Sequence, residues 1–219
     1  MGVAAHLGIA LDEYDARIRT FIPDYEEMLA AGAACVPAGA RTIVDLGVGT
    51  GALALRARRF ARRSTIVGVD SDAAILDAAR RRLGPRARFV TGSFLSLDLP
   101  RSDAIVACLA LHHVRTRRAK ARLYRNITGS LRSRGVFVTV DCHPAEDRAL
   151  ARMQRAAWEA HLGRSYGAAG AHRFLAAWAQ EDVYVPLEAE RRMIERAGLT
   201  SEVVWRKGMF AVVRAVKRQ

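Results

Sequence analysis

The stretch from Arg41 to Ala52 constrains the fold more than any other part of the sequence. It begins with a run of β-branched residues, turns at Gly47, Gly49 and Gly51, and continues into a helix-like pattern. Glycines at such positions permit positive φ angles and let a ligand approach the backbone closely. A strand that enters a glycine-rich turn and then opens a helix is typical of a ligand-binding α/β sheet.

Short apolar runs alternate with helix-like stretches through the first two thirds of the chain. The expected strands are Arg41–Leu46, Ser64–Asp70, Ala87–Thr91, Ser102–Leu111 and Val136–Asp141. The expected helices between them are Ala52–Arg63, Ala73–Leu83 and Arg117–Leu131. Ser71 and Asp72 are suitable N-cap residues for the second of these helices. This alternation predicts an α/β fold, a doubly wound and mostly parallel sheet with helices on both faces.

Three regions extend this core. Before the core, helices are expected within Leu11–Cys35, with a break near Pro23. After the fifth strand, an insertion is expected to form helices Ala145–His161 and Ala171–Gln180 around a glycine-rich break at Gly163–Gly170. The C-terminal region is expected to form helix Leu187–Ala197 and a closing hairpin of strands Ser201–Arg206 and Met209–Val216. The hairpin brings the sheet to seven strands. We expect a single domain over residues 1–219, with an N-terminal helical cap (1–40), a ligand-binding core (41–141), a helical lid insertion (142–185) and a C-terminal helix and hairpin (186–219).

Composition excludes several classes of protein. A chain of 219 residues that is 51% hydrophobic suits one domain with a packed core. Three cysteines without paired spacing argue against a zinc ribbon or a disulfide scaffold, so a cytoplasmic location is expected. The longest apolar run, Ala104–Leu111, is far shorter than the roughly 20 residues of a membrane helix, so no membrane partner is expected. HExxH and GxSxG patterns are absent, so no metal site is predicted.

The net charge of +13 raises the question of a nucleic-acid partner. Only three of the 35 basic residues are lysines, a bias that is also typical of a GC-rich coding sequence. Most arginine clusters follow helices that lead away from the expected ligand edge. Arg115, Arg117 and Arg118 instead begin a helix beside that edge, so RNA binding stays open but is not favoured.

Two acidic residues distinguish between possible ligands of the glycine turn. Asp45 precedes the first glycine by two positions, where a carboxylate would repel a pyrophosphate but suit an ammonium group. Asp70 ends the second strand about 20 residues after the glycine turn, where an acid can bind both ribose hydroxyls. One acid for an amine and one for a ribose fit S-adenosylmethionine (SAM) better than NAD.

Four motifs, in this order, resemble those of the class I SAM-dependent methyltransferases. They are Val44–Gly51, Gly68–Leu76, Asp103–Val106 leading to Leu111-His112-His113, and Leu131–Gly135. The resemblance covers about residues 41–141, and the C-terminal hairpin is similar to the last two strands of the family. It implies a Rossmann-like fold, SAM as the cofactor and methyl transfer as the reaction.

The resemblance also implies a set of cofactor contacts. Asp45, Gly47, Gly49 and Gly51 would line the methionine part, Asp70 and Ser71 would bind the ribose, and Ile75 would pack near the adenine. The family usually has an acid after the third strand for the adenine amine. This sequence has Ser93 and Phe94 there, so a weaker hydrogen bond or ring stacking is expected instead. Tyr25 and Arg19 are candidates for binding the SAM carboxylate.

Three histidines are candidates for chemistry. His112 and His113 are expected at the end of the fourth strand, where alternation points them to opposite faces, so at most one faces the methyl group. We predict His113 as a general base for an oxygen or nitrogen acceptor, with His143 after the fifth strand as a second candidate. Packing or hydrogen bonding remains an alternative for each of them.

The acceptor is expected to contact the insertion and the N-terminal cap. Trp158 and Tyr166 in the insertion, together with Tyr14 and His112, are the predicted substrate contacts, although aromatic residues at helical spacing are also typical of packing. We therefore predict methyl transfer from SAM to a small-molecule acceptor, by a monomer or a homodimer. The alternatives are an RNA or tRNA methyltransferase, an enzyme like the carboxy-SAM synthases, and a SAM-binding protein without catalysis.

Overall fold

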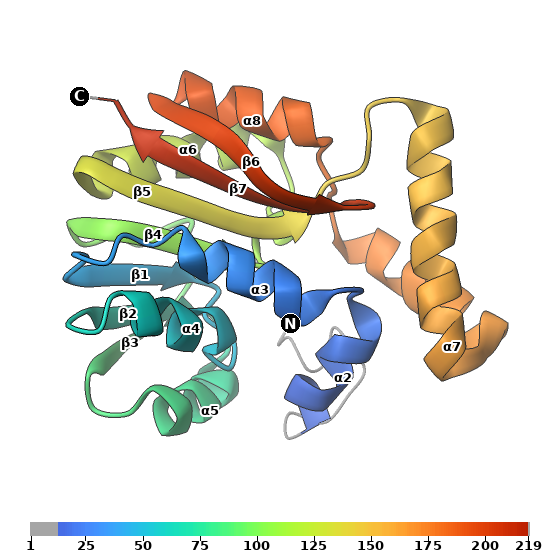
Figure 1. The fold of residues 1–219 in the computed structure, drawn as a ribbon, viewed down its shortest axis with the longest axis horizontal. Helices are drawn as coiled ribbons and strands as arrows, with labels where there is room; N and C mark the ends of the chain where they lie inside the picture. The colour runs from blue at the N-terminus through green and yellow to red at the C-terminus, as the bar shows by residue number, and fades with distance from the viewer. Residues whose placement is uncertain (1–12, 219) are drawn as a thin grey trace.

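The computed structural model describes residues 13–218, and within them the strands form one seven-stranded sheet (Figure 1). Its order is β3-β2-β1-β4-β5-β7-β6, with β1 to β5 parallel and β7 antiparallel to both β5 and β6. The strands are β1 Thr42–Leu46, β2 Thr65–Asp70, β3 Ala87–Thr91, β4 Ser102–Cys108, β5 Leu131–Cys142, β6 Leu199–Lys207 and β7 Phe210–Lys217. The predicted fold class is confirmed.

Helices cover both faces of the sheet because successive side chains of each strand point to opposite sides. Ile43 of β1 belongs to the apolar cluster formed with α2, α3, α4, α5 and α7, whereas its neighbour Val44 belongs to the cluster formed with α6 and α8. The helices are α2 Tyr14–Phe21, α3 Tyr25–Ala34, α4 Ala52–Phe60, α5 Ala73–Leu83, α6 Arg117–Ser130, α7 Arg148–Glu181 and α8 Leu187–Arg196. None of the helices between residues 13 and 218 is both long and apolar enough to cross a bilayer.

The strand order reverses direction at β1, which lies between β2 and β4. Asp45 near the end of β1 pairs with Gly68 of β2 on one side and with Val106 of β4 on the other. The connections from β1 and β4 leave this end of the sheet toward opposite faces, which opens a crevice where doubly wound folds bind ligands. Figure 1 shows α2 and α7 at this same end of the sheet.

Several element ends differ from the sequence predictions. The fourth strand stops at Cys108 rather than Leu111, because Leu109 takes a φ of 49° that extended backbone cannot have. Helix α4 ends at Phe60 rather than Arg63, and β5 already begins at Leu131. Asp72 is the N-cap of α5, as expected, and its side chain accepts a hydrogen bond from the Ala74 N–H.

The insertion after β5 folds as a doubled-back helical arm. The sequence predicts a glycine-rich break over Gly163–Gly170, but in the structure only Gly167 of α7 has a non-helical backbone, with a φ of 67° and a ψ of 166°. The two halves of α7 lie against each other, since the rings of Trp158 and Trp178 stack with their centroids 5.4 Å apart. One glycine therefore turns a long helix into a two-helix arm.

The conformation of Gly167 predicts opposite effects for two glycine substitutions in α7. Gly167→Ala should lower the free energy of unfolding by about 1–3 kcal/mol, because only glycine adopts this backbone region readily. Gly163 has helical backbone and open space around its Cβ position, so Gly163→Ala should raise stability by about 0.4–1 kcal/mol. Thermal denaturation followed by circular dichroism measures both. Equal midpoints for the two variants would contradict the assigned kink.

Candidate active site

The glycine turn after β1 forms the floor of the crevice. Gly47, Gly49 and Gly51 all have positive φ, at 67°, 53° and 82°. A Cβ on Gly47 would lie only 2.6 Å from the Cβ of Ala110. The turn therefore needs glycine both for its backbone conformation and for its close passage beside the segment that follows β4.

Asp45 is a buried acid whose hydrogen-bonding capacity is not filled. Its side chain is almost inaccessible, and among the described residues its Oδ1 atom has no hydrogen-bond partner. Burial and the nearby charge of Asp70 raise its pKa to about 8, although a backbone hydrogen bond from Ala54 opposes this shift. A bound cation beside Asp45 would favour the ionised carboxylate and fill the unused oxygen.

Asp70 is held in place by the backbone of two loops. Its Oδ2 atom accepts a hydrogen bond from the Gly49 N–H at 3.0 Å, and its Oδ1 atom accepts one from the Asp72 N–H at 3.0 Å. Burial nevertheless raises its pKa. Each carboxylate oxygen keeps a second lone pair, so both can accept a further hydrogen bond from a ligand hydroxyl.

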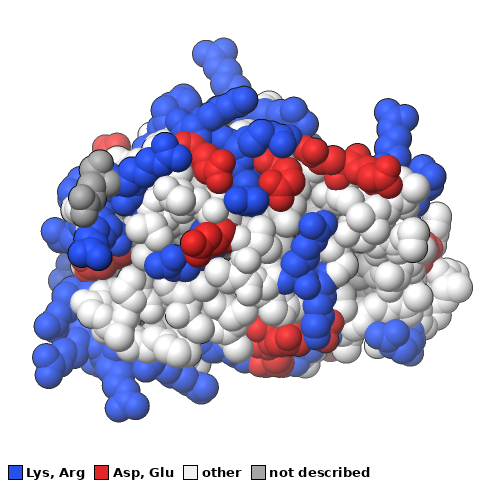
Figure 2. All heavy atoms as spheres, turned by 45° about the horizontal axis from the view of Figure 1, so that its top comes forward, with Lys and Arg blue, Asp and Glu red and all other residues white. Residues whose placement is uncertain are grey.

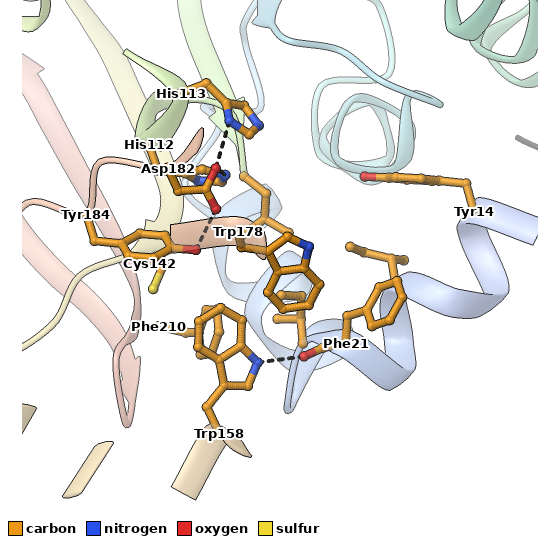
Figure 3. A pocket seen from close by; sticks show the side chains of 13 residues that line it. Tyr14, Phe21, His112, His113, Cys142, Trp158, Trp178, Asp182, Tyr184 and Phe210 are labelled. Carbon is orange, nitrogen blue, oxygen red and sulfur yellow. Dashed lines mark hydrogen bonds and ion pairs between the residues drawn. The ribbon is translucent and has the colours of Figure 1, made fainter. Parts of the chain in front are cut away.

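Three cavities meet at Tyr14 and Leu109, which line all of them. The outer cavity, of about 350 Å³, follows the ends of β1, β2 and β3. The inner cavity, of about 30 Å³, lies beside Asp45 under the glycine turn. The aromatic cavity, of about 50 Å³, lies between α2 and α7 (Figure 3). A ligand that reaches from one cavity to another must pass Tyr14 and Leu109.

The structure gathers most of the predicted cofactor residues around the outer and inner cavities. The residues that line one or both are Asp45, Gly47, Gly49, Asp70, Ser71, Ser93, Phe94 and Tyr25. Gly51 and Ile75 lie just beneath. A Cβ on Gly51 would be 3.0 Å from Leu83, and the Cδ1 atom of Ile75 is 3.8 Å from the Cβ position of Gly49. The structure therefore brings these predicted residues together around one crevice.

Arg19, a predicted contact of the cofactor carboxylate, lies outside the three cavities. Its Nε atom donates a hydrogen bond to Glu26 at 2.8 Å, and both side chains are about half exposed. Arg19 lines none of the three cavities. Helix α2 turns Ile18 and Phe21 toward the core, which leaves Arg19 on its outer side.

His112 and His113 lie in a short 3₁₀ helix, Leu111–His113, and not at the end of a strand. The positive φ of Leu109 ends the strand alternation before it reaches them. Their ring centroids are 4.2 Å apart, and both rings approach the carboxylate of Asp182 (Figure 3). The expectation that they point to opposite faces is therefore wrong.

A chain of hydrogen bonds connects this histidine pair to two buried acids. His112 Nδ1 donates to Asp141 Oδ1 at 2.5 Å, and His113 Nδ1 lies 3.1 Å from Asp182 Oδ1. The Tyr184 hydroxyl donates to Asp182 Oδ2 at 2.5 Å. Burial lowers the pKa of His112, but the charges of Asp141 and Asp182 and the hydrogen bond to Asp141 together raise it by more. Burial raises the pKa of Asp182, but the histidines and Tyr184 lower it by more, so this carboxyl is ionised at neutral pH.

Aromatic side chains from distant segments wall the third cavity. They are Phe21 of α2, Trp158 and Trp178 of the two halves of α7, Tyr184 after α7, and Phe210 of β7. Trp158 Nε1 donates to the Phe21 carbonyl at 2.8 Å, which ties the arm to the N-terminal cap. Trp158 is thus placed at the cavity, as predicted for a substrate contact. His112, His113 and Asp182 form the polar end of the same cavity (Figure 3).

Two other predicted site residues do not line the cavities. Tyr166 stacks on Phe21 and forms a hydrogen bond with Thr20, so it supports the cap from outside the cavity. His143 is buried, and its Nδ1 atom donates to the carbonyl of Val185 at 3.1 Å. The structure therefore gives Tyr166 and His143 packing and anchoring contacts in place of the predicted contacts with substrate.

Asp182 is the main site residue that sequence reasoning did not single out. It is the C-cap of α7, and its backbone N–H donates to Trp178. The next residue, Val183, donates its N–H to the carbonyl of His112 at 2.8 Å, which brings Asp182 beside the histidines. No local pattern marks this contact, because it depends on where the insertion returns to the sheet.

A family model described as a methyltransferase domain matches residues 43–135. This range begins in β1 and ends in β5, so it contains the glycine turn, Asp70, Ser93, Phe94 and the histidine pair. The match thus covers most of the residues that line the outer and inner cavities, whereas Tyr14, Tyr25, the arm and the C-terminal hairpin lie outside it.

Similar proteins extend this match over the rest of the chain. An uncharacterised methyltransferase of Geobacillus sp. (strain WCH70) is 26% identical over 214 residues, which is 95% of this chain and 92% of the relative. An O-methyltransferase family protein from Burkholderia thailandensis superposes with a TM-score of 0.72 and 19% identity, over 98% of this chain and 61% of its own. Human N-acetylserotonin methyltransferase, solved with SAM, has a TM-score of 0.63 and 16% identity, over 87% of this chain and 52% of its own.

This chain therefore spans little more than half the length of those two solved proteins, and their likeness describes the fold. The family match shows that residues 43–135 are similar to a methyltransferase domain, and the likeness to a solved O-methyltransferase family protein extends the same fold over 98% of the chain.

Proposed function

We propose that this chain transfers a methyl group from SAM to an oxygen or nitrogen atom of a small, mainly apolar acceptor. The main support for this proposal is that three cavities adjoin one another and share two wall residues, Tyr14 and Leu109. Two of these cavities carry the acids and glycines expected for a SAM site, and the third is aromatic with a polar end. Donor and acceptor would meet at the shared wall.

The residues around the outer and inner cavities fit SAM. The unpartnered Oδ1 atom of Asp45 suits the ammonium of the methionine part, and Tyr25 lies in the same inner cavity. The spare lone pairs of Asp70 suit the two ribose hydroxyls. Ser93 and Phe94 line the far part of the outer cavity, where the adenine would lie. Bound SAM supplies a methyl group on a sulfonium, which needs an aligned nucleophile and no covalent catalyst.

The aromatic cavity supports a small acceptor. Tyr14, Trp158 and the other aromatic rings give it mainly apolar walls, and His113 lines both this cavity and the outer one. Of the two predicted bases, only His113 lines both cavities, so we propose that His113 acts on the acceptor at the reacting atom. Holding the acceptor atom and the SAM methyl group in line can lower the activation free energy of methyl transfer by up to about 7–11 kcal/mol.

The distribution of charge favours a small acceptor over RNA. Figure 2 shows Lys and Arg side chains gathered at the left end of the view, the end at which the parallel strands begin. Exposed arginines there include Arg62, Arg63, Arg86, Arg132 and Arg134. Arg115 does line the outer cavity, but the aromatic cavity between α2 and α7 has a mainly apolar lining, in which the described residues include no arginine or lysine. A small, mainly apolar cavity suits a small molecule better than a polynucleotide.

The raised pKa of Asp45 predicts that SAM affinity depends on pH. Below its pKa of about 8 the acid must lose a proton before it can pair with an ammonium, so the dissociation constant for SAM should fall roughly tenfold per unit as pH rises from 6 toward 8. Calorimetry across this range measures the change. Asp45→Asn should bind more weakly and show a flat profile over the same range. If SAM affinity of Asp45→Asn still rose steeply with pH, the group that loses a proton on binding would be another acid, such as Asp70.

Replacing His113 tests the acceptor end separately from the cofactor end. Transfer of labelled methyl from SAM should be measured against panels of phenols, amines and thiols and against bulk tRNA. With an accepted small molecule, His113→Ala should lower kcat by about 10²–10⁴-fold and leave SAM affinity within a few-fold. His172→Ala is the matched control, because His172 is an exposed histidine of α7. Methylation of tRNA alone would contradict the small-acceptor proposal.

A further inference from the structure

Three side chains with metal-binding groups converge where the outer and aromatic cavities adjoin. His113 Nδ1 lies 3.1 Å from Asp182 Oδ1, and His112 Nε2 lies 3.8 Å from the same oxygen. One ligand atom from each of the three residues lies within 4.8 Å of the other two. The histidines come from the turn after β4 and the acid from the end of α7, so the fold itself assembles the cluster (Figure 3).

The spacing and the donor types fit a transition-metal ion. Ligand atoms at about 2.0–2.1 Å from one Zn²⁺ ion are roughly 3–3.4 Å apart. The His113–Asp182 distance lies in this range, and the His112–Asp182 distance of 3.8 Å is slightly longer. Two imidazole nitrogens and one carboxylate are a donor set for Zn²⁺ or Fe²⁺, whereas Mg²⁺ and Ca²⁺ prefer oxygen ligands.

Outer hydrogen bonds support two of the three ligands. His112 Nδ1 donates to Asp141, which leaves the Nε2 lone pair directed toward the cluster. Asp141 is itself fixed by the backbone N–H groups of Leu111 and Cys142. The Tyr184 hydroxyl holds the other oxygen of Asp182. Carboxylates behind histidines and hydrogen bonds behind carboxylates are typical supports of protein metal ligands.

The charge of the cluster also favours a cation. The side chains of Asp141 and Asp182 are only 2% and 3% exposed, and Asp182 lines the cavity that is walled by aromatic rings. Buried carboxylates are costly unless a positive charge balances them. One divalent ion bound to neutral imidazoles would balance both acids at once.

We propose that His112 Nε2, His113 Nδ1 and Asp182 Oδ1 bind one divalent transition-metal ion of the Zn²⁺ or Fe²⁺ type. Its role rests on the proposed function, because the ligands lie where donor and acceptor would meet. Three protein ligands leave a position for an acceptor hydroxyl, whose proton then passes to solvent while the oxygen stays bound. In this arrangement His113 acts on the acceptor as a metal ligand and not as a free general base.

Metal titration of the full chain tests the site. After treatment with a chelator, the wild type should bind one Co²⁺ per chain, with visible absorption bands and quenching of the fluorescence of Trp178, which lines the same cavity. Zn²⁺ should displace the Co²⁺. Asp182→Asn and His113→Ala should weaken Co²⁺ binding at least tenfold. Asp141 supports the ligand His112 through a hydrogen bond, so Asp141→Asn should weaken Co²⁺ binding about 10–100-fold. His172→Ala should bind as the wild type does.

SAM calorimetry on each variant separates metal loss from unfolding, and the methyl-transfer assay separates this inference from the proposed function. A wild type that takes up no Co²⁺ or Zn²⁺ overturns the metal site, even if it transfers methyl groups. Unchanged Co²⁺ binding in Asp182→Asn overturns it as well, since the ion would then lie on other histidines. The site is supported if the wild type binds one Co²⁺ and only the variants of the ligands and of Asp141 lose it. This result supports the metal site even if the wild type does not bind SAM.

Discussion

The buried carboxylate of Asp141 fixes the geometry on which the polar end of the site depends. It accepts hydrogen bonds from the backbone N–H groups of Leu111, His112 and Cys142 and from the ring of His112. Burial raises its pKa, but the charge and hydrogen bond of His112, together with the charges of His143 and Lys120, lower it by more, so the acid is ionised. Leaving one such buried donor without a partner costs about 1–3 kcal/mol. The turn after β4 is therefore fixed to the end of β5, and the histidine pair is fixed with it.

A second set of contacts closes the crevice from the N-terminal side. Asp15 of α2 forms an ion pair with Arg82 of α5 and accepts a hydrogen bond from Thr50 of the glycine turn at 2.7 Å. Arg82 also donates to the Thr50 hydroxyl at 2.7 Å. Because Tyr14 precedes Asp15, the same contacts hold Tyr14 at the wall that the three cavities share. The cap thus connects the cofactor end and the acceptor end of the site.

Sequence reasoning succeeded where local chemistry decides the structure. The glycine turn, Asp45 and Asp70 follow from backbone limits and strand ends, and each lies where it was expected. It failed where one unusual residue or a distant partner decides. Leu109 ends β4 by its positive φ and so turns both histidines to one side, which no propensity indicates. Asp182 reaches them only through the return of the arm to the sheet.

The attachment of the arm has a consequence for how this fold can diversify. The arm leaves the sheet after β5 and returns where Val185 accepts a hydrogen bond from His143, so its two ends lie side by side. Closing a flexible loop between fixed ends costs only about 0.6 kcal/mol more for each doubling of its length. The closure entropy of this segment therefore depends only weakly on its length, and a change of length in the arm would alter the aromatic wall around Trp158 and Trp178 while the glycine turn stays intact.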